Sequence, residues 1–136
     1  MSKSKQPSTF QSVRIEKDTL DQLAENCLEE AQTFLHCNYV SKRKYINGGW
    51  VNIHPTTYLV HGSESLPLLH AYNIPFAPQI HVFKKKGELK QFTLVFPPIP
   101  KDWESFSMIE ECNSDEGFVV SNIKRNNSGV YEVAIH

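Results

Sequence analysis

The strongest constraint on this chain is a two-residue alternation of apolar and polar side chains that begins at Thr33. Successive side chains of a β-strand point to opposite faces, so the alternation is typical of strands that bury one face. Its clearest instances are residues 33–40, 89–96 and 130–135. Further short strands are expected at 50–55, 57–60, 66–72, 80–83, 105–110 and 117–123. Strands spaced by roughly ten residues predict an all-β fold rather than alternating strands and helices.

Turn signals set the expected pairing of these strands. Residues 47–49, Asn-Gly-Gly, supply the positive φ of a tight turn, so we expect the strand that begins at Trp50 to return antiparallel against residues 33–40. Residues 61–65 are expected to form a loop. The prolines of residues 97–100 remove ladder donors and favour an extended exit, which suits a crossover from one sheet to the other.

These elements predict an immunoglobulin-like sandwich of two antiparallel sheets, with a closed barrel as the alternative. One short helix is expected before it, because over residues 18–31 apolar side chains recur at steps of three and four while acidic residues fill the other face. Residues 1–8 have no hydrophobic period and are expected to be a flexible leader, which leaves 9–136 as a single domain. With 136 residues and 40% hydrophobic content, the chain has enough apolar material for one core.

The charge balance excludes a strong overall field. The 14 basic residues stand against 15 acidic ones, a net charge of −1, so we expect no nucleic-acid partner. The sequence shows neither an apolar leader nor a run of about 18 apolar residues, so we expect a soluble, cytoplasmic chain with no membrane span. Two basic clusters, residues 42–44 and 84–86, form a positive patch only if their turns lie at the same end of the sandwich. Each also fits an ordinary solubilising turn.

Residue types that carry chemistry are present but are not arranged as sites. The six histidines lack the i, i+2 or i, i+4 spacing of a local metal-ligand pair. There is no G-x-S-x-G elbow, and the glycine pair at 48–49 is not a phosphate-binding loop. The carboxylate pairs 110–111 and 115–116 fall in polar stretches where solvated charge is expected. We therefore expect no enzyme activity, no catalytic or metal-binding residue and no cofactor.

The cysteines are Cys27, Cys37 and Cys112, an odd number without C-x-x-C spacing. We expect reduced, partly buried thiols, because an unoxidised cysteine behaves as a small hydrophobic residue. A disulfide between Cys37 and Cys112 is the alternative.

Aromatic side chains are the best candidates for contact with a partner or ligand, although most are expected in the core. Trp103 is expected to be exposed, because it stands in the polar segment Pro-Lys-Asp-Trp-Glu-Ser at 100–105. An exposed tryptophan is a frequent anchor of interfaces. The other expected contact residues are Trp50, Tyr72, Lys84 and Lys85.

Three blocks of the sequence resemble a known family. They are residues 50–60 (WVNIHPTTYLV), 66–74 (LPLLHAYNI) and 92–111 (FTLVFPPIPKDWESFSMIEE). In this order they resemble a β-sandwich domain of unknown function that recurs in Bacteroidetes proteins, alone or beside thioredoxin-like or peptidase domains. The resemblance spans roughly residues 31–123 and implies the sandwich fold, but it brings no catalytic residue.

The chain departs from that family at two positions inside these blocks. Asn73 stands where the family has a glycine before Ile74, and Trp103 stands where it usually has a threonine. The helix expected at 18–31 has no counterpart in the family. These are the places where this chain is expected to differ from its relatives.

The expected function is a non-catalytic interaction or accessory module that binds a protein partner or a neighbouring domain, with self-association as a further option. The alternative is a sandwich that binds a small ligand or a carbohydrate. In that case exposed aromatic side chains such as Trp50, Tyr72 and Trp103 would be the stacking platforms.

Overall fold

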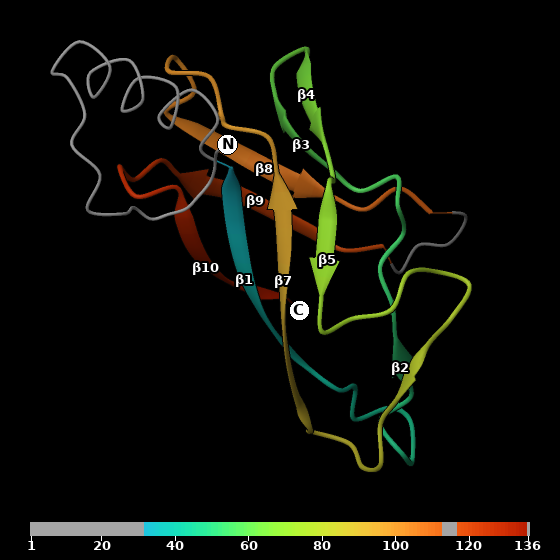
Figure 1. The fold of residues 1–136 in the computed structure, drawn as a ribbon. Coiled ribbons are helices and arrows are strands. Elements are labelled where there is room, and N and C mark those ends of the chain that lie inside the picture. Colours follow the sequence, from blue (N-terminus) through green and yellow to red (C-terminus); the bar gives the residue numbers. More distant parts are fainter. Residues whose placement is uncertain (1–31, 113–116, 136) are drawn as a thin grey trace, which may run out of the picture. The chain divides into compact units, whose positions relative to one another are not determined.

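The structure is a computed structural model that describes residues 32–112 and 117–135 of the chain, all within one compact unit (Figure 1). Every regular element in this part of the chain is a β-strand, and no helix occurs in it. The all-β prediction is confirmed. The leader expected at 1–8 and the helix expected at 18–31 lie outside the described residues.

Ten strands follow one another along the described part of the chain. They are β1 (Thr33–Val40), β2 (Trp50–Val51), β3 (Tyr58–His61), β4 (Glu64–Pro67), β5 (His70–Tyr72), β6 (His81–Val82), β7 (Leu89–Phe96), β8 (Ser105–Ile109), β9 (Val119–Lys124) and β10 (Val130–Ile135). The three strands with the clearest alternation in sequence, β1, β7 and β10, have the predicted bounds.

The first sheet has the order β10-β1-β7-β5. Strand β1 lies inside it, antiparallel to β7 and parallel to β10, so that Cys37 is opposite both Phe92 and Val133. The prediction of two antiparallel sheets is therefore wrong for this sheet, which is mixed, because β10 runs along the second side of β1 in the same direction. Alternate residues of these strands are buried, as a sheet with one covered face requires. Strand β7 becomes buried on both faces toward its end, where Leu94, Val95 and Phe96 are consecutive buried residues.

The second sheet has the order β4-β3-β8-β9 and is antiparallel throughout. Strands β3 and β4 form a hairpin whose two connecting residues are Gly62 and Ser63, with a φ of +60° at Gly62. The pairing of β8 with β9 shifts register between Phe106 and Met108. The segment 61–65, predicted to be a loop, therefore consists mostly of strand ends on either side of a tight turn. Glycine provides the conformation of this turn at no steric cost.

The two four-stranded sheets pack in a sandwich-like arrangement, with the core between them. A contact that joins them is the edge-to-face pair of Phe106 on β8 and Tyr131 on β10, with ring centroids 5.2 Å apart. The stretch 97–100 connects β7 of the first sheet to β8 of the second, so the predicted crossover is confirmed. Burial of large apolar side chains from both sheets supplies the main stabilisation, about 1.5–3 kcal/mol for each.

The partner predicted for the strand at Trp50 is wrong. Strand β2 pairs with β6 in a separate two-stranded sheet, where Trp50 is opposite Val82. Strand β1 has no vacant edge to offer, because β7 and β10 occupy both of its sides. The Asn-Gly-Gly turn therefore leads the chain away from β1 instead of back along it.

The strand predicted at 66–72 is two strands in different sheets. The change of sheet falls between Leu68 and Leu69: the amide of Leu68 donates to the carbonyl of Thr57, and the amide of Leu69 donates to the carbonyl of Val95. Strand β4 thus ends beside β3, and β5 begins beside β7. A single apolar run can therefore supply both sheets, because adjacent backbone groups find partners on different sides.

Candidate ligand pocket

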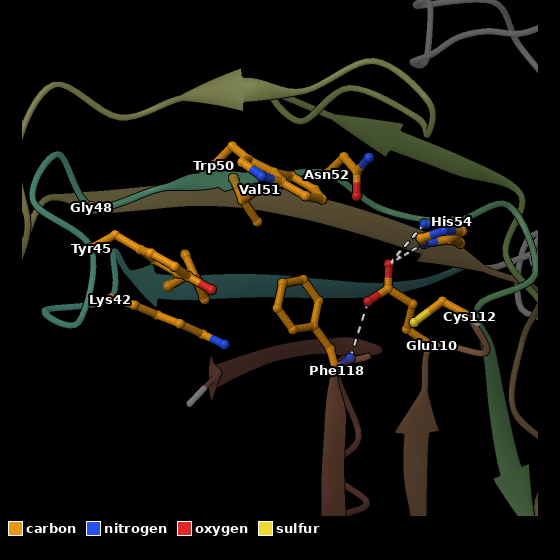
Figure 2. Close-up of a pocket in the computed structure, with 11 residues that line it drawn as sticks. Lys42, Tyr45, Gly48, Trp50, Val51, Asn52, His54, Glu110, Cys112 and Phe118 are labelled. Atoms are coloured by element: carbon orange, nitrogen blue, oxygen red, sulfur yellow. Dashed lines mark hydrogen bonds and ion pairs between the residues drawn. The ribbon is translucent and has the colours of Figure 1, made fainter. Parts of the chain in front are cut away.

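A pocket of about 270 Å³ lies between strand β2, the segment that follows it and the end of strand β8 (Figure 2). We call it the Trp50 pocket. The residues that line it are Tyr39, Lys42, Tyr45, Gly48, Trp50, Val51, Asn52, His54, Glu110, Cys112 and Phe118. Apolar and aromatic walls with a few polar groups are the usual composition of a small-ligand site.

Glu110 provides the buried acidic group of the pocket. Its Oε2 accepts a hydrogen bond from the backbone N–H of His54 at 2.9 Å, and its Oε1 accepts one from the backbone N–H of Phe118 at 3.0 Å. The amide of Glu110 also donates to the carbonyl of Phe118. The prediction that residues 110–111 are solvated charges is wrong for Glu110, which is 6% exposed, because two backbone donors replace water around its carboxylate.

The imidazole of His54 is held by the same carboxylate. Its Nδ1 lies 3.0 Å from Glu110 Oε2, while the side chain is 36% exposed. With a carboxylate as acceptor, Nδ1 carries the proton, so Nε2 of the neutral ring keeps a lone pair. His54 can therefore accept a hydrogen bond from a hydroxyl group in the pocket.

Asn52 places a buried amide beside the histidine. Its Nδ2 donates to the carbonyl of Gln79 at 2.9 Å, which fixes the orientation of the side chain. Figure 2 shows the amide oxygen pointing toward the pocket, and no residue of the described part of the chain donates a hydrogen bond to it. Asn52 is 8% exposed, so this oxygen is a buried acceptor that has no partner among the described residues. Buried polar atoms normally have a hydrogen-bond partner, and a ligand hydroxyl would supply one here.

Two partly exposed aromatic residues form the outer wall. Trp50 is 56% exposed and Tyr45 is 42% exposed. The Tyr45 ring packs against Gly49, where an added Cβ would lie 2.9 Å from ring atom Cδ2. The Nζ of Lys44 lies 5.1 Å from the centre of the Tyr45 ring, within the range of a cation–π contact. This packing holds the tyrosine in place beside the pocket.

The cysteines have different environments. Cys37 is buried in the core, and Cys112 is half-buried in the pocket lining. Burial, together with a smaller contribution from the charge of Glu132, raises the pKa of Cys37 to about 12. Both residues are thiols, so the alternative of a disulfide between them is wrong.

The residues predicted to contact a partner do not form one surface. Trp50 lies in the pocket, and Lys84 and Lys85 are exposed in the turn between β6 and β7. Tyr72 is 57% exposed on the edge strand β5, where its ring lies beside His70. It borders a separate shallow depression on the polar face of the first sheet.

The predicted exposure of Trp103 is wrong, since this side chain is completely buried. Its Nε1–H donates to Glu64 Oε1 at 2.9 Å, and its ring stacks on that of His61 with centroids 5.4 Å apart. The β3–β4 hairpin supplies both contacts. The flanking residues Lys101 and Asp102 are exposed. The indole is thus buried by residues that are distant in sequence, although its neighbours in sequence are polar.

The histidines make separate contacts with their neighbours. Nδ1 of His36 is 2.8 Å from the hydroxyl of Thr93, and Nδ1 of His61 is 2.7 Å from the carbonyl of Ser105. Among residues 32–112 and 117–135, no group of three His, Cys, Asp or Glu side chains is suited to hold a metal ion.

The fold and the pocket define an all-β sandwich with a hollow that has apolar and aromatic walls and a few polar groups. No protein-family model, no curated protein and no solved structure matches the chain. In the part of the chain that the structure describes, no helix has the length and apolar character needed to span a bilayer.

Proposed function

We propose that this chain is a non-catalytic binding module that holds a small polyhydroxylated ligand, a saccharide, in the Trp50 pocket. The observation that carries the proposal is the buried amide oxygen of Asn52, which faces the pocket beside two partly exposed aromatic rings and receives no hydrogen bond from residues 32–112 and 117–135. The volume of about 270 Å³ is just below the usual range for ligand pockets, about 300–1,000 Å³, and suits a ligand the size of one sugar ring.

The polar and apolar groups match the two kinds of surface on a sugar. The apolar C–H face of a pyranose can pack on the ring of Trp50, an amphipathic side chain that contributes contact area at low entropic cost. Its hydroxyl groups can donate to Asn52 Oδ1 and to His54 Nε2. Glu110 acts as a positioning residue, because it fixes the ring of His54 and the backbone on either side of the pocket.

Isothermal titration with a panel of neutral, amino and acidic monosaccharides and disaccharides tests the proposal. We expect at least one sugar to bind the full chain with a millimolar dissociation constant. Asn52→Ala and Trp50→Ala should each weaken that binding by about tenfold or more, because each removes a hydrogen bond or a stacking surface. Tyr72→Ala is the matched control, since it removes an equally exposed aromatic ring outside the pocket. No binding of any sugar by the wild type contradicts the proposal.

A protein partner is the second candidate function. Trp103 is buried and cannot contact such a partner. Strand β5, however, is an exposed edge of the first sheet and carries Tyr72. Exposed edges can accept a further strand, and the simplest partner is a second copy of the chain. Sedimentation of the wild type and of Tyr72→Lys tests this. A dimer that the variant loses supports self-association, and a monomer at high concentration in both contradicts it.

We also assign the sandwich to the immunoglobulin-like group and to the Bacteroidetes family that it resembles. The support is the pair of four-stranded sheets linked by crossovers, together with the φ of +65° at Asn73, where that family has glycine. The thiols of Cys37 and Cys112 further support a reducing, cytoplasmic location. A crystal structure of a family member tests the assignment through its strand order.

A further inference from the structure

We propose that one end of the sandwich, formed by residues 41–49 and 84–88, docks on a lipid surface with anionic headgroups. We call this region the basic end. The proposal does not depend on a ligand in the Trp50 pocket. Ser41, a buried residue, joins the two segments.

Ser41 makes hydrogen bonds to the second segment through its backbone and its side chain. Its amide donates to the carbonyl of Glu88 at 2.8 Å, and its Oγ donates to the carbonyl of Lys85 at 2.9 Å. The amide of Glu88 in turn donates to Ser41 Oγ at 2.7 Å, and the amide of Gly87 donates to the Ser41 carbonyl at 3.1 Å. The two segments therefore lie together at the same end of the sandwich, as Figure 1 also shows.

This arrangement brings the two basic clusters together. The cations that they contribute are Lys42, Arg43, Lys44, Lys84, Lys85 and Lys86. The two segments contain one carboxylate, Glu88, and its Oε1 accepts a hydrogen bond from the amide of Lys84. Arg43 reaches across to the second segment, since a Cβ on Gly87 would lie 3.2 Å from its Nη2. A nearly neutral chain thus has one strongly cationic end, which complements an anionic partner.

Apolar side chains among the cations favour a lipid partner. Ile46, in the turn after Lys44, is 91% exposed, and the partly exposed rings of Tyr45 and Trp50 lie beside it around a second hollow. Headgroup regions accept this combination, because aliphatic tips enter the acyl boundary, aromatic rings lie at the interface and lysines bind anionic headgroups. Nucleic acid would use the cations and the rings but would offer Ile46 no apolar environment.

Co-sedimentation of the full chain with vesicles tests the proposal. We expect binding to phosphatidylcholine vesicles that contain phosphatidylserine, weak binding to phosphatidylcholine alone, and weakening by salt. Lys85→Glu with Lys86→Glu should reduce binding at least tenfold, because each lysine near an anionic leaflet contributes roughly fivefold. The control is Lys101→Glu with Lys124→Glu, which makes the same charge change at exposed positions in other segments.

Two further variants separate the parts of the proposal. Ile46→Ser should weaken vesicle binding without changing its salt dependence, because it removes an apolar contact and no charge. Asn52→Ala should leave vesicle binding unchanged, since its side chain is in the pocket and is buried. Equal binding by the two charge-reversed variants overturns the proposal. An absence of binding to phosphatidylserine vesicles also overturns it, and binding of single-stranded nucleic acid through Lys85 and Lys86 in that case would identify the other anionic partner.

Discussion

The carboxylate of Glu110 lies 2.9 Å from the backbone nitrogen of His54 and 3.0 Å from Nδ1 of its ring. The second oxygen of the same carboxylate accepts a hydrogen bond from the backbone of Phe118. One buried side chain thus satisfies donors from two segments that are far apart from each other in sequence. The wall of the Trp50 pocket depends on this arrangement.

Replacement of Glu110 by alanine should destabilise the fold by about 3 kcal/mol, because the amides of His54 and Phe118 would lose their acceptors in a buried position. Urea denaturation measures the change. Glu111→Ala is the control, since it removes the same charge from an exposed side chain and should cost less than about 0.5 kcal/mol. Equal costs at the two positions would show that the hydrogen bonds of Glu110 contribute little.

Trp103→Ala should be the more damaging of the two tryptophan substitutions, with a loss of about 3–5 kcal/mol, because it leaves a cavity where a completely buried indole stood. Trp50→Ala should cost less than about 1 kcal/mol, because that side chain is largely exposed. Thermal or urea denaturation of both variants provides the comparison. A Trp103→Ala protein as stable as Trp50→Ala would contradict the buried position.

Gly48 in the basic end and Gly62 in the β3–β4 turn both have a positive φ, but they differ in the space available for a side chain. Gly48 has a φ of +82°, and an added Cβ would collide with the Lys85 carbonyl and lie 2.7 Å from Ser41 Oγ. Gly62 has a φ of +60° and open space around it. Gly62→Ala should therefore cost about 1 kcal/mol for the left-handed conformation alone. Gly48→Ala should cost about 2 kcal/mol more, because neighbouring atoms must move.

The measurement for this pair is urea denaturation of both variants beside the wild type. Equal losses would show that the segments 41–49 and 84–88 can separate without cost. That result would also weaken the argument that Ser41 holds the two basic clusters together.

Strands could be predicted from the sequence where one face alone is buried. Strands β1 and β10 have the predicted bounds because each alternates apolar and polar side chains over its length, and β7 alternates before its end becomes buried on both faces. Strand pairing could not be predicted in the same way, because a turn signal is local and the neighbours of β1 come from distant parts of the chain. For this reason the partner predicted for β2 is wrong.

The pocket is harder to predict from the sequence than the fold. Trp50 was expected to contact a ligand or partner, but Asn52, His54 and Glu110 were not, since the last two are 56 positions apart and no local motif links them. Glu110 ends a predicted strand beside the exposed Glu111, and sequence alone does not distinguish a buried carboxylate from a solvated neighbour. Trp103 shows the reverse case, in which polar neighbours conceal a buried residue.

Cys37 should make the stability of the folded state depend on pH in the alkaline range. Burial raises its pKa from the usual 9.0 to about 12, and its Sγ lies 3.6 Å from the carbonyl of Leu35. The folded chain therefore keeps this proton at pH values where the unfolded chain releases it. The stability due to the neutral thiol is fully present below about pH 9 and is lost as the pH rises toward 12. The folded state should thus be weakened over that interval.

Urea denaturation of the wild type and of Cys37→Ala over this pH range measures the effect, because titrations of other groups cancel in the difference. Cys37→Ala should be less stable than the wild type near neutral pH, owing to the lost packing, and the gap should narrow above about pH 9. Thiol alkylation gives an independent measurement. At neutral pH the native chain should react at Cys112 in the pocket lining well before Cys37, because a thiolate reacts and a buried thiol neither ionises nor meets the reagent. Equal rates at the two cysteines, or a stability gap that stays constant with pH, would place Cys37 outside the core.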